Sequence, residues 1–247
     1  MISKSQISFI KSLQQKKIRK EHGLFIVEGL KSVSEFINSD YTVDTIFYTE
    51  NVMPKLDILS HNIKAIEISV QDLTKISALT NPQQILALVK VPKSRVLTTE
   101  MLKGSFTIAL DGIQDPGNLG TIIRSADWFG IKLLVCSEDT VDVYNSKVVQ
   151  ATMGSLSRIQ VAYTDLEKFL EDAGVPLFGA VLDGKSIYET EFGNEGILIF
   201  GNEGNGIRPE ISMKIEFPVT IPRFGNAESL NVGVSASIIC SEIRRNS

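Results

Sequence analysis

The residues whose types could support chemistry gather in the C-terminal half of the chain, next to glycines. A short apolar run over residues 197–200 ends in Gly201-Asn202-Glu203-Gly204-Asn205-Gly206. Glycine has no Cβ, so its backbone N–H groups can approach a ligand closely. A second strand-like segment over 215–219 leads to Ile221, and Ser229-Leu230-Asn231 precedes a helix-like segment. Because ligands of open α/β sheets bind beyond the carboxyl ends of strands, this pattern predicts a small-molecule pocket.

The glycine loop does not fit the two commonest nucleotide signatures. A dinucleotide site has G-x-G-x-x-G directly after the first strand, and a triphosphate site has G-x-x-x-x-G-K-[ST]. Here the glycines read G-x-x-G-x-G and come late in the chain. Taken alone, the loop also fits a plain turn, so other residues must identify the ligand.

Length and composition indicate a globular protein with room for two domains. The chain has 247 residues, of which 43% are apolar and 22% are charged. No apolar run approaches the roughly 20 residues that cross a bilayer, and the N-terminus lacks the apolar core of a signal peptide. The two cysteines and two histidines have no metal-binding spacing. We therefore expect a cytoplasmic protein without a metal site.

Two series of alternating strands and helices position these residues. In the first series, expected helices cover 5–20, 29–37, 54–59 and 70–77, and expected strands cover 24–27, 43–48, 64–68 and 84–91. In the second, expected strands cover 106–110, 131–136, 158–161, 177–182, 197–200 and 215–219, and expected helices cover 116–129, 145–152, 164–173 and 230–243. The alternation predicts a small α/β sandwich followed by an α/β domain with a mainly parallel sheet. We place the domains at 1–91 and 105–247, with a linker at 92–104.

Charge is distributed unevenly between the two parts. Residues 1–95 carry 13 Lys and Arg and 9 Asp and Glu, a net charge of +4, whereas the remainder carries 12 and 20, a net charge of −8. The basic residues before the first acid include Lys16, Lys17, Arg19 and Lys20. This asymmetry indicates that the N-terminal part meets a polyanion. On charge alone, a solvated helix face is an equally good interpretation.

Three stretches in order identify a family. They are Asp111-Gly112-Ile113-Gln114-Asp115-Pro116-Gly117-Asn118-Leu119-Gly120-Thr121-Ile122-Ile123-Arg124, then Ile199-Phe200-Gly201-Asn202-Glu203-Gly204-Asn205-Gly206-Ile207, then Ile221-Pro222 with Ser229-Leu230-Asn231-Val232. They resemble the three motifs of the SpoU–TrmH family of RNA ribose methyltransferases. The region from Arg19 through Glu28-Gly29 to Asn81-Pro82-Gln83 looks like the ribosomal-protein-like RNA-binding domain that often precedes them.

The resemblance implies the fold, the activity and the assembly. The implied fold is an α/β-knot domain, with a mainly parallel sheet whose C-terminal segment is threaded into a trefoil knot, behind the small α/β sandwich. The implied activity is S-adenosylmethionine-dependent methylation of a ribose 2′-hydroxyl in ribosomal or transfer RNA, by a homodimer. Residues 230–243 are apolar on most sides, which predicts a buried helix and would suit a dimer interface.

The resemblance also assigns catalytic roles to five polar residues. Arg124 matches the family's catalytic arginine; a guanidinium stays protonated in proteins, so we favour a phosphate clamp that stabilises the developing alkoxide over a base. Asn118 would orient the ribose or Arg124, or make a cap-like hydrogen bond at the helix start. Glu203 would hold Arg124 or the acceptor, or be a solvated loop glutamate. Ser229 and Asn231 would line the catalytic pocket, although Ser229 alone would be interpreted as a helix N-cap.

Four further residues fall where the family binds the adenosine and methionine parts of the cofactor. They are Leu182, Gly201, Ile221 and Leu230. For the three apolar side chains, burial in a core is the competing interpretation. An RNA-binding protein that keeps the fold without turnover is the alternative function, and the presence of all five polar motif residues argues against it. A Rossmann-type methyltransferase acting on a small molecule is disfavoured by the late glycine loop.

Overall fold

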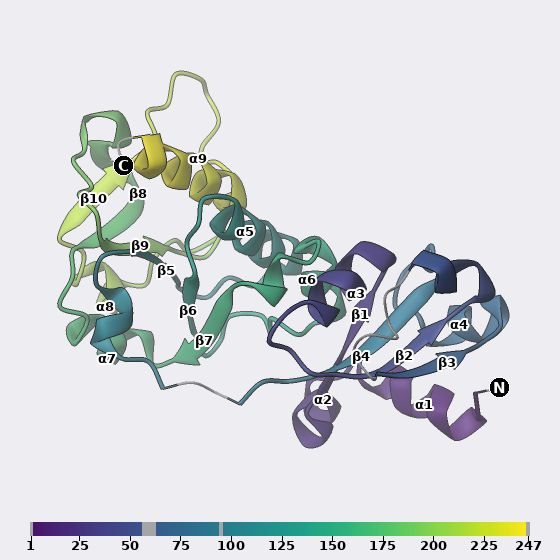
Figure 1. The fold of residues 1–247 in the computed structure, drawn as a ribbon. Helices are drawn as coiled ribbons and strands as arrows, with labels where there is room; N and C mark the ends of the chain where they lie inside the picture. Colours follow the sequence, from purple (N-terminus) through teal and green to yellow (C-terminus); the bar gives the residue numbers. More distant parts are fainter. Residues whose placement is uncertain (1, 56–62, 94–95, 246–247) are drawn as a thin grey trace. The chain divides into compact units, whose positions relative to one another are not determined.

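The computed structural model describes residues 2–55, 63–93 and 96–245, and the chain divides into two compact units (Figure 1). Unit 1 comprises Met1–Lys93 and Asp142–Ser157, and unit 2 comprises Ser94–Val141 and Arg158–Ser247. Unit 1 is therefore built from two separate pieces of the chain. The expected helix at 54–59 falls largely on residues outside the described ranges; a 3₁₀ helix, η1, covers Glu50–Lys55.

A four-stranded sheet of order β1-β4-β2-β3 forms the centre of unit 1. Its strands are β1 (Leu24–Glu28), β2 (Val43–Tyr48), β3 (Lys64–Glu67) and β4 (Ile85–Lys90). β4 runs antiparallel to both β1 and β2, whereas β2 and β3 are parallel. The predicted α/β sandwich is thus confirmed, with a mixed sheet.

The α-helices in the first piece of unit 1 cover both faces of this sheet. They are α1 (Lys4–Ser12), α2 (Lys16–His22), α3 (Leu30–Ile37) and α4 (Val70–Ile76). Ile10 and Leu13 pack with Leu73 of α4 against one face, while Phe36 of α3 contacts Phe25 of β1, with ring centroids 5.7 Å apart. The single helix expected at 5–20 is divided in two, because the helical hydrogen bonds of α1 end at Leu13.

The second piece of unit 1, residues 142–157, packs on β1. It contains α6 (Ser146–Ala151) and the short 3₁₀ helix η4 (Ser155–Ser157), and α6 contacts β1 directly. The Tyr144 ring lies 4.7 Å from that of Phe25, within a cluster that includes Phe36 and Tyr41. Burial raises the pKa of both Tyr41 and Tyr144. The sequence pattern predicted a helix at 145–152, but it did not indicate that this helix packs in unit 1.

Arg19 is buried in unit 1, unlike the lysines with which the sequence analysis grouped it. Its side chain is 4% exposed. Nη1 donates to the carbonyls of Leu13 and Gln14 at 2.9 and 2.7 Å, and Nε and Nη2 donate to Asp142 Oδ2 at 3.1 and 2.5 Å. Four of the five guanidinium N–H donors are used in this way, and the buried side chain is not exposed to a phosphate. We therefore correct the prediction for Arg19, which is a structural residue here.

Six parallel strands form the sheet of the described part of unit 2, in the order β10-β8-β9-β5-β6-β7. They are β5 (Phe106–Leu110), β6 (Leu133–Ser137), β7 (Gln160–Thr164), β8 (Leu177–Ser186), β9 (Gly196–Phe200) and β10 (Phe217–Thr220). Its helices are η3 (Thr99–Leu102), α5 (Pro116–Trp128), α7 (Leu166–Glu171), η5 (Ile187–Glu189), α8 (Pro209–Ser212) and α9 (Val232–Arg245). The predicted α/β domain with a parallel sheet is confirmed.

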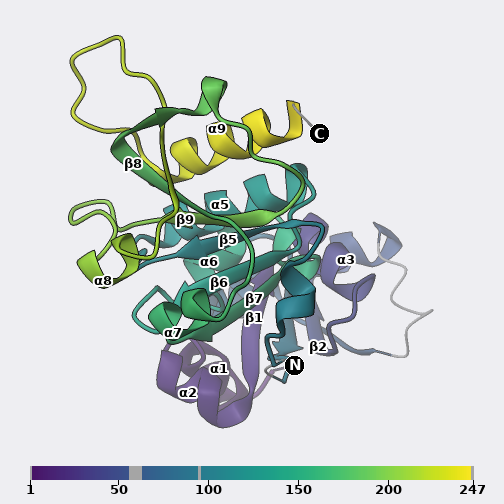
Figure 2. The same cartoon turned by 90° about the vertical axis from the view of Figure 1, so that its left-hand side faces the viewer.

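Both faces of this sheet are covered, and the helices that matter for the site lie together. Leu170 of α7 and Ile211 of α8 pack with Ala109 of β5 in one core cluster. α5 and α9 contact each other and lie side by side on the opposite face (Figures 1 and 2). Because α5 follows β5 directly, its first turn lies at the carboxyl end of that strand. In the described residues no helix is long and apolar enough to cross a membrane.

We expect the ion pair between Arg19 and Asp142 to be essential to unit 1. Asp142→Ala would leave a buried guanidinium without its carboxylate, and breaking a buried pair in this way costs about 3–5 kcal/mol. Native-state hydrogen exchange of the β1 amides would measure the loss within this unit. Asp72→Ala, which removes the exposed pair with Lys75, is the matched control. A loss as small as that of the control would contradict the prediction.

Candidate functional site

The carboxyl ends of β5 and β9 place two of the three sequence stretches side by side. The strands are parallel neighbours with Leu110 opposite Phe200, and the N–H of Asp111 donates to the carbonyl of Phe200 at 2.9 Å. Both chains therefore leave the sheet at the same edge. One continues into α5 and the other into the glycine loop.

Two helices begin at this edge, each with its own side-chain cap. Asp115 caps α5: its Oδ1 accepts the N–H of Asn118 at 2.8 Å, and Pro116 occupies the first turn. Asn231 caps α9: its Oδ1 accepts the N–H groups of Gly233 and Val234 at 3.0 and 3.2 Å. An acidic residue followed by proline is a local sequence signal for such a helix start. At α9 the cap is Asn231, and not Ser229.

α5 and α9 run parallel, and this brings their first turns together. A Cβ at Gly233 would lie 3.0 Å from the Thr121 side chain, so glycine permits the close approach. One turn further on, the Ser125 and Ser237 hydroxyls lie 2.6 Å apart. The third sequence stretch is thereby fixed against the first.

A chain of hydrogen bonds joins all three stretches. Asn231 Nδ2 donates to Asn118 Oδ1 at 2.8 Å, and Asn118 Nδ2 donates to Glu203 Oε1 at 2.6 Å. Since the Asn231 oxygen faces the N-terminus of α9, every amide in the chain has its direction fixed. The two amide N–H groups point along the chain towards the Glu203 carboxylate. A negative charge is favourable at this place, because the N-termini of α5 and α9 lie close by.

The five predicted catalytic residues divide into two groups. Asn118, Glu203 and Asn231 contact one another, so the contact of Asn118 is with Glu203 and not with Arg124. Arg124 and Ser229 are exposed, and among the described residues neither makes a side-chain hydrogen bond or an ion pair. Arg124 projects from α5, the helix that begins with the Asn118 turn.

Leu182 lies within β8, Gly201 and Ile221 directly follow β9 and β10, and Leu230 lies shortly before α9. Thr220 donates its hydroxyl to the carbonyl of Leu182 at 3.1 Å, and Ile221 follows directly. Leu182 is 77% exposed and Leu230 is 49% exposed. Burial in the protein core therefore does not explain these two leucines. Exposed apolar side chains suit the apolar part of a ligand.

Gly201 is required by the loop itself. A Cβ at this position would lie 2.2 Å from the backbone of Gly206, because the loop closes on itself through paired hydrogen bonds between Asn202 and Gly206 at 2.9 Å. Any side chain at Gly201 would force this turn open. The loop backbone therefore constrains residue 201 to glycine, independently of the cofactor role that the family resemblance implies.

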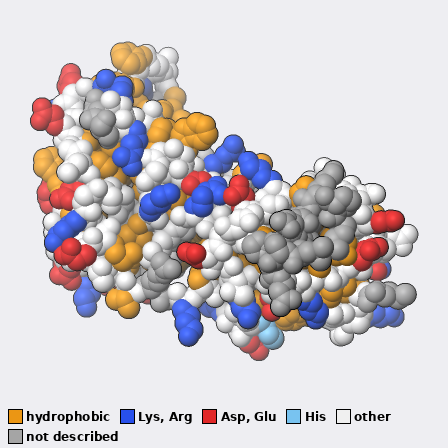
Figure 3. All heavy atoms as spheres, in the orientation of Figure 1, with side chains coloured by type: hydrophobic (Ala, Val, Ile, Leu, Met, Phe, Trp, Pro, Cys, Tyr) orange, Lys and Arg blue, Asp and Glu red, His pale blue; other side chains and the backbone are white. Residues whose placement is uncertain are grey.

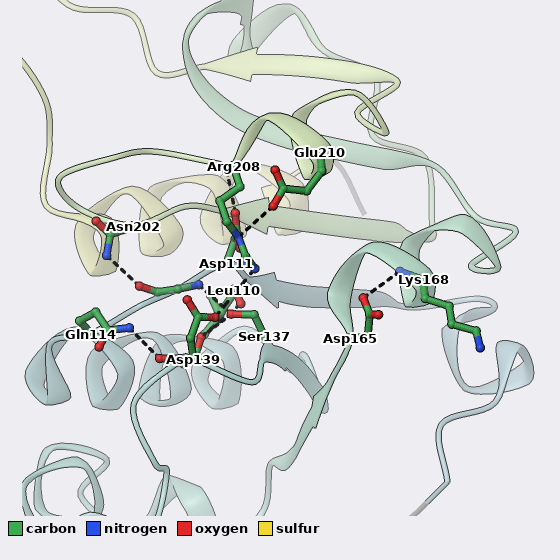
Figure 4. Close-up of polar contacts among 12 residues, drawn as sticks. Leu110, Asp111, Gln114, Ser137, Asp139, Asp165, Lys168, Asn202, Arg208 and Glu210 are labelled. Atoms are coloured by element: carbon green, nitrogen blue, oxygen red, sulfur yellow. Dashed lines mark hydrogen bonds and ion pairs between the residues drawn. The ribbon is translucent and has the colours of Figure 1, made fainter.

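Two interactions missed by the sequence analysis hold the glycine loop (Figure 4). Asn202 Nδ2 donates to the carbonyl of Gly112 at 2.8 Å. Arg208 donates to Asp111 through its backbone N–H at 2.8 Å and through Nε at 2.7 Å. Asp111 opens the first recognised stretch, but a lone Asp beside a glycine gives no signal that its partner lies 97 positions away.

Metal and thiol chemistry receive no support from the described residues. No group of His, Cys, Asp and Glu among them could hold a metal ion. Cys136 and Cys240 are buried, and burial raises the pKa of the Cys240 thiol to about 12. A cavity of about 880 Å³ in unit 2, between Tyr188 and Arg245, contains none of the motif residues in its lining.

Comparison with known proteins gives first the class of protein. The solved structure of a protein described as an RNA methyltransferase of the TrmH family, from Porphyromonas gingivalis, matches all of both chains with 38% identity and a TM-score of 0.90. An rRNA methyltransferase from Sinorhizobium meliloti, solved with bound AdoMet, matches 99% of this chain and 97% of its own, with 28% identity and a TM-score of 0.87. The fold is that of RNA methyltransferases.

The family follows from the sequence comparisons. The chain belongs to the SpoU rRNA methylase family, whose model matches residues 105–241. An MRM3-like substrate binding domain matches residues 4–87. A 23S rRNA (guanosine(2553)-2′-O)-methyltransferase, RlmP of Bacillus subtilis, is 31% identical over 238 residues, which cover 95% of this chain and 94% of that protein. The resemblance inferred from the three stretches is confirmed.

We expect the direction of the amide chain to matter for the loop. Asn118→Asp would place a second carboxylate against Glu203, and two carboxylates in contact raise one pKa strongly. Above that pKa the repulsion should loosen the loop, and below it a shared proton should restore the contact. Hydrogen exchange of residues 201–206, corrected for the intrinsic pH dependence, would show faster exchange at neutral pH than at acid pH. Asn118→Leu, which carries no charge, should show no such difference; equal profiles for both variants would contradict the prediction.

Proposed function

We propose that this protein transfers a methyl group from S-adenosylmethionine to a ribose 2′-hydroxyl in ribosomal or transfer RNA. The observation that carries the proposal is the hydrogen-bonded chain Asn231–Asn118–Glu203, which unites the three family stretches at one edge of the sheet. The Bacillus subtilis relative is a 2′-O-methyltransferase by name, and the similar structure from Sinorhizobium meliloti contains the cofactor. All five polar motif residues are present.

The residues at this edge fit the cofactor. Leu182 and Leu230 offer exposed apolar surface, the backbone of Ile221 follows β10, and Gly201 begins the loop that follows β9. When bound, the sulfonium supplies the methyl group that the 2′-oxygen attacks in line. We assign Leu182, Gly201, Ile221 and Leu230 to the cofactor side of the site.

Arg124 is assigned to the RNA acceptor. Its side chain projects from α5 and has no hydrogen-bond or ion-pair partner among the described residues. The guanidinium is therefore available to bind a phosphate. Bound there, it would orient the ribose and stabilise the negative charge that develops on the 2′-oxygen. Glu203 is held by Asn118 and is therefore fixed in place to accept a hydrogen bond from the acceptor. Ser229 and Asn231 would line the same pocket.

Unit 1 is assigned to RNA capture. Lys16, Lys17 and Lys20 are exposed on α2. In Figure 3, Lys and Arg side chains lie on the surface near this helix, with acidic and histidine side chains among them. The net charge of +4 over residues 1–95 favours a polyanion. We propose residues 1–91 as the substrate-binding domain, 92–104 as a linker and 105–247 as the methyltransferase domain, with residues 142–157 of the latter packed into unit 1.

The assembly is proposed to be a homodimer in the cytoplasm, with the C-terminal segment threaded as the trefoil knot of the family. Val234 of α9 is 45% exposed and Trp128 at the end of α5 is 84% exposed. Two adjacent helices that leave large apolar side chains in water have a surface that a second copy would bury.

Labelled S-adenosylmethionine incubated with RNA from a host that lacks the modification tests the activity. We expect the label in a nuclease-resistant dinucleotide, because a 2′-O-methyl group blocks cleavage at that position. Label in a base, or no labelled RNA while S-adenosylhomocysteine binds, would contradict the proposal. The second of these outcomes would favour an RNA-binding protein of the same fold without turnover.

Arg124→Ala is expected to reduce turnover by about 10²–10³-fold while leaving cofactor affinity unchanged, because the arginine faces the acceptor. Arg124→Lys should also be slow, since a point charge cannot reproduce a planar two-pronged clamp. Single-turnover rates and calorimetry with S-adenosylhomocysteine would separate the two properties. A lysine variant with the wild-type rate would contradict the clamp.

Changing Lys16, Lys17 and Lys20 together to glutamine should weaken RNA binding and its dependence on salt. For every phosphate that the variant no longer neutralises, the log–log salt slope should flatten by roughly 0.7 for a single strand. The matched control changes Lys31, Lys64 and Lys90, which are exposed elsewhere in unit 1. Equal slopes for the two triple variants would identify the α2 lysines as an ordinary solvated face.

A further inference from the structure

The loop that carries Glu203 is fastened at two points to the same short segment after β5. At its start, Asn202 donates to the carbonyl of Gly112 at 2.8 Å, and its Oδ1 accepts the N–H groups of Gly204 and Asn205 at 2.9 and 3.1 Å. At its end, Arg208 binds Asp111. Residues 111–112 therefore fix both ends of the loop.

The second attachment is a buried carboxylate with one cationic partner. The Asp111 side chain is 0% exposed. Its Oδ2 accepts the backbone N–H of Arg208 at 2.8 Å, and its Oδ1 accepts Nε at 2.7 Å and lies 2.5 Å from Nη2. A buried carboxylate needs such donors, because burying a charge without a partner is strongly unfavourable. Asp111 thus dictates where Arg208, and the loop before it, must lie.

The surroundings of Arg208 exclude a role in binding RNA phosphate. Besides Asp111, the carboxylates of Asp139 and Glu210 lie 3.8 and 3.9 Å from its guanidinium nitrogens (Figure 4). The hydrogen bond to Asp111, and then the charges of all three acids, raise the pKa of the Arg208 guanidinium. A phosphate would meet three negative charges there. This distinguishes Arg208 from Arg124, which has no such partner among the described residues.

We propose that Asp111 and Arg208 are positioning residues for the methyl-transfer site: their ion pair holds the 201–206 loop so that it can receive the cofactor and keep Glu203 against Asn118. The inference rests on the proposed function, since it assigns the loop to S-adenosylmethionine. Neither residue touches the reactants. Their effect passes through the loop backbone, which the paired hydrogen bonds between Asn202 and Gly206 keep closed.

Arginine at 208 is required by the geometry of the pair. The guanidinium places two nitrogens on Asp111 Oδ1 while the backbone N–H of the same residue occupies Oδ2. A lysine ammonium keeps the charge but cannot reproduce this planar fork. The orientation of the loop therefore depends on the planar guanidinium of arginine at position 208, and not only on its positive charge.

The test measures cofactor binding and loop protection in the full-length protein. The variants are Arg208→Gln, Arg208→Lys, Asp111→Asn and the double variant Asp111→Asn with Arg208→Gln. Arg158→Gln is the matched control, because Arg158 also forms a fork with a carboxylate of unit 2, that of Asp127, and is similarly exposed. All measurements are made well below the melting temperature of every variant.

We expect Arg208→Gln to raise the Kd for S-adenosylhomocysteine and the KM for S-adenosylmethionine by about 10–100-fold, the scale of a misplaced binding group. Hydrogen exchange over residues 200–208 should accelerate, and RNA affinity should stay unchanged. Arg208→Lys should lie between wild type and Arg208→Gln. The double variant, in which two amides can pair, should recover part of the affinity lost in either single variant.

Three results would overturn the proposal: wild-type cofactor affinity and loop exchange in Arg208→Gln, the same losses in Arg158→Gln, or a double variant no better than the single ones. If Arg208→Gln does not fold, the cofactor affinity and loop exchange of Arg208→Lys test the proposal, since this variant retains the positive charge. Wild-type protein that binds no S-adenosylhomocysteine would contradict the proposed function instead. In that case exchange in the 200–208 segment would still show whether the ion pair positions the loop.

Discussion

The parallel pairing of β5 with β9 is the constraint on which the site depends. Two segments separated by about ninety positions leave the sheet at one edge because their strands are hydrogen-bonded neighbours with Leu110 opposite Phe200. Everything polar in the site follows from that edge. The first turn of α5 supplies Asn118, the loop after β9 supplies Glu203, and α9 completes the arrangement because it packs along α5 in parallel.

Sequence patterns predicted much of this arrangement, for identifiable reasons. Apolar runs bounded by glycines predict buried strands, and Asp115-Pro116 predicts the start of a helix. Both predictions succeed because each signal depends only on neighbouring residues in the sequence. The three stretches could be assigned to one family because their order and spacing are distinctive. Within them, Asn118, Glu203 and Asn231 prove to be in contact.

What the sequence could not predict depends on partners distant along the chain. Arg19 looked like its lysine neighbours, since nothing local reveals that its guanidinium meets Asp142. Asp111 and Arg208 each look ordinary in isolation, and only the fold places one beside the other. In each case the deciding contact is made by tertiary structure, which neither composition nor periodicity encodes.

Because unit 1 is built from two separate pieces of the chain, it cannot complete its folding early in synthesis. Arg19 and Asp142 are 123 positions apart. At a synthesis rate of about 5–20 residues per second, Asp142 is therefore made roughly 6–25 seconds after Arg19. During that interval β1 lacks the Tyr144 ring and α6. The N-terminal unit, although made first, must therefore complete its folding together with the middle of the chain, and a nascent chain halted before residue 142 would expose an unfinished apolar face to the chaperones of the cell.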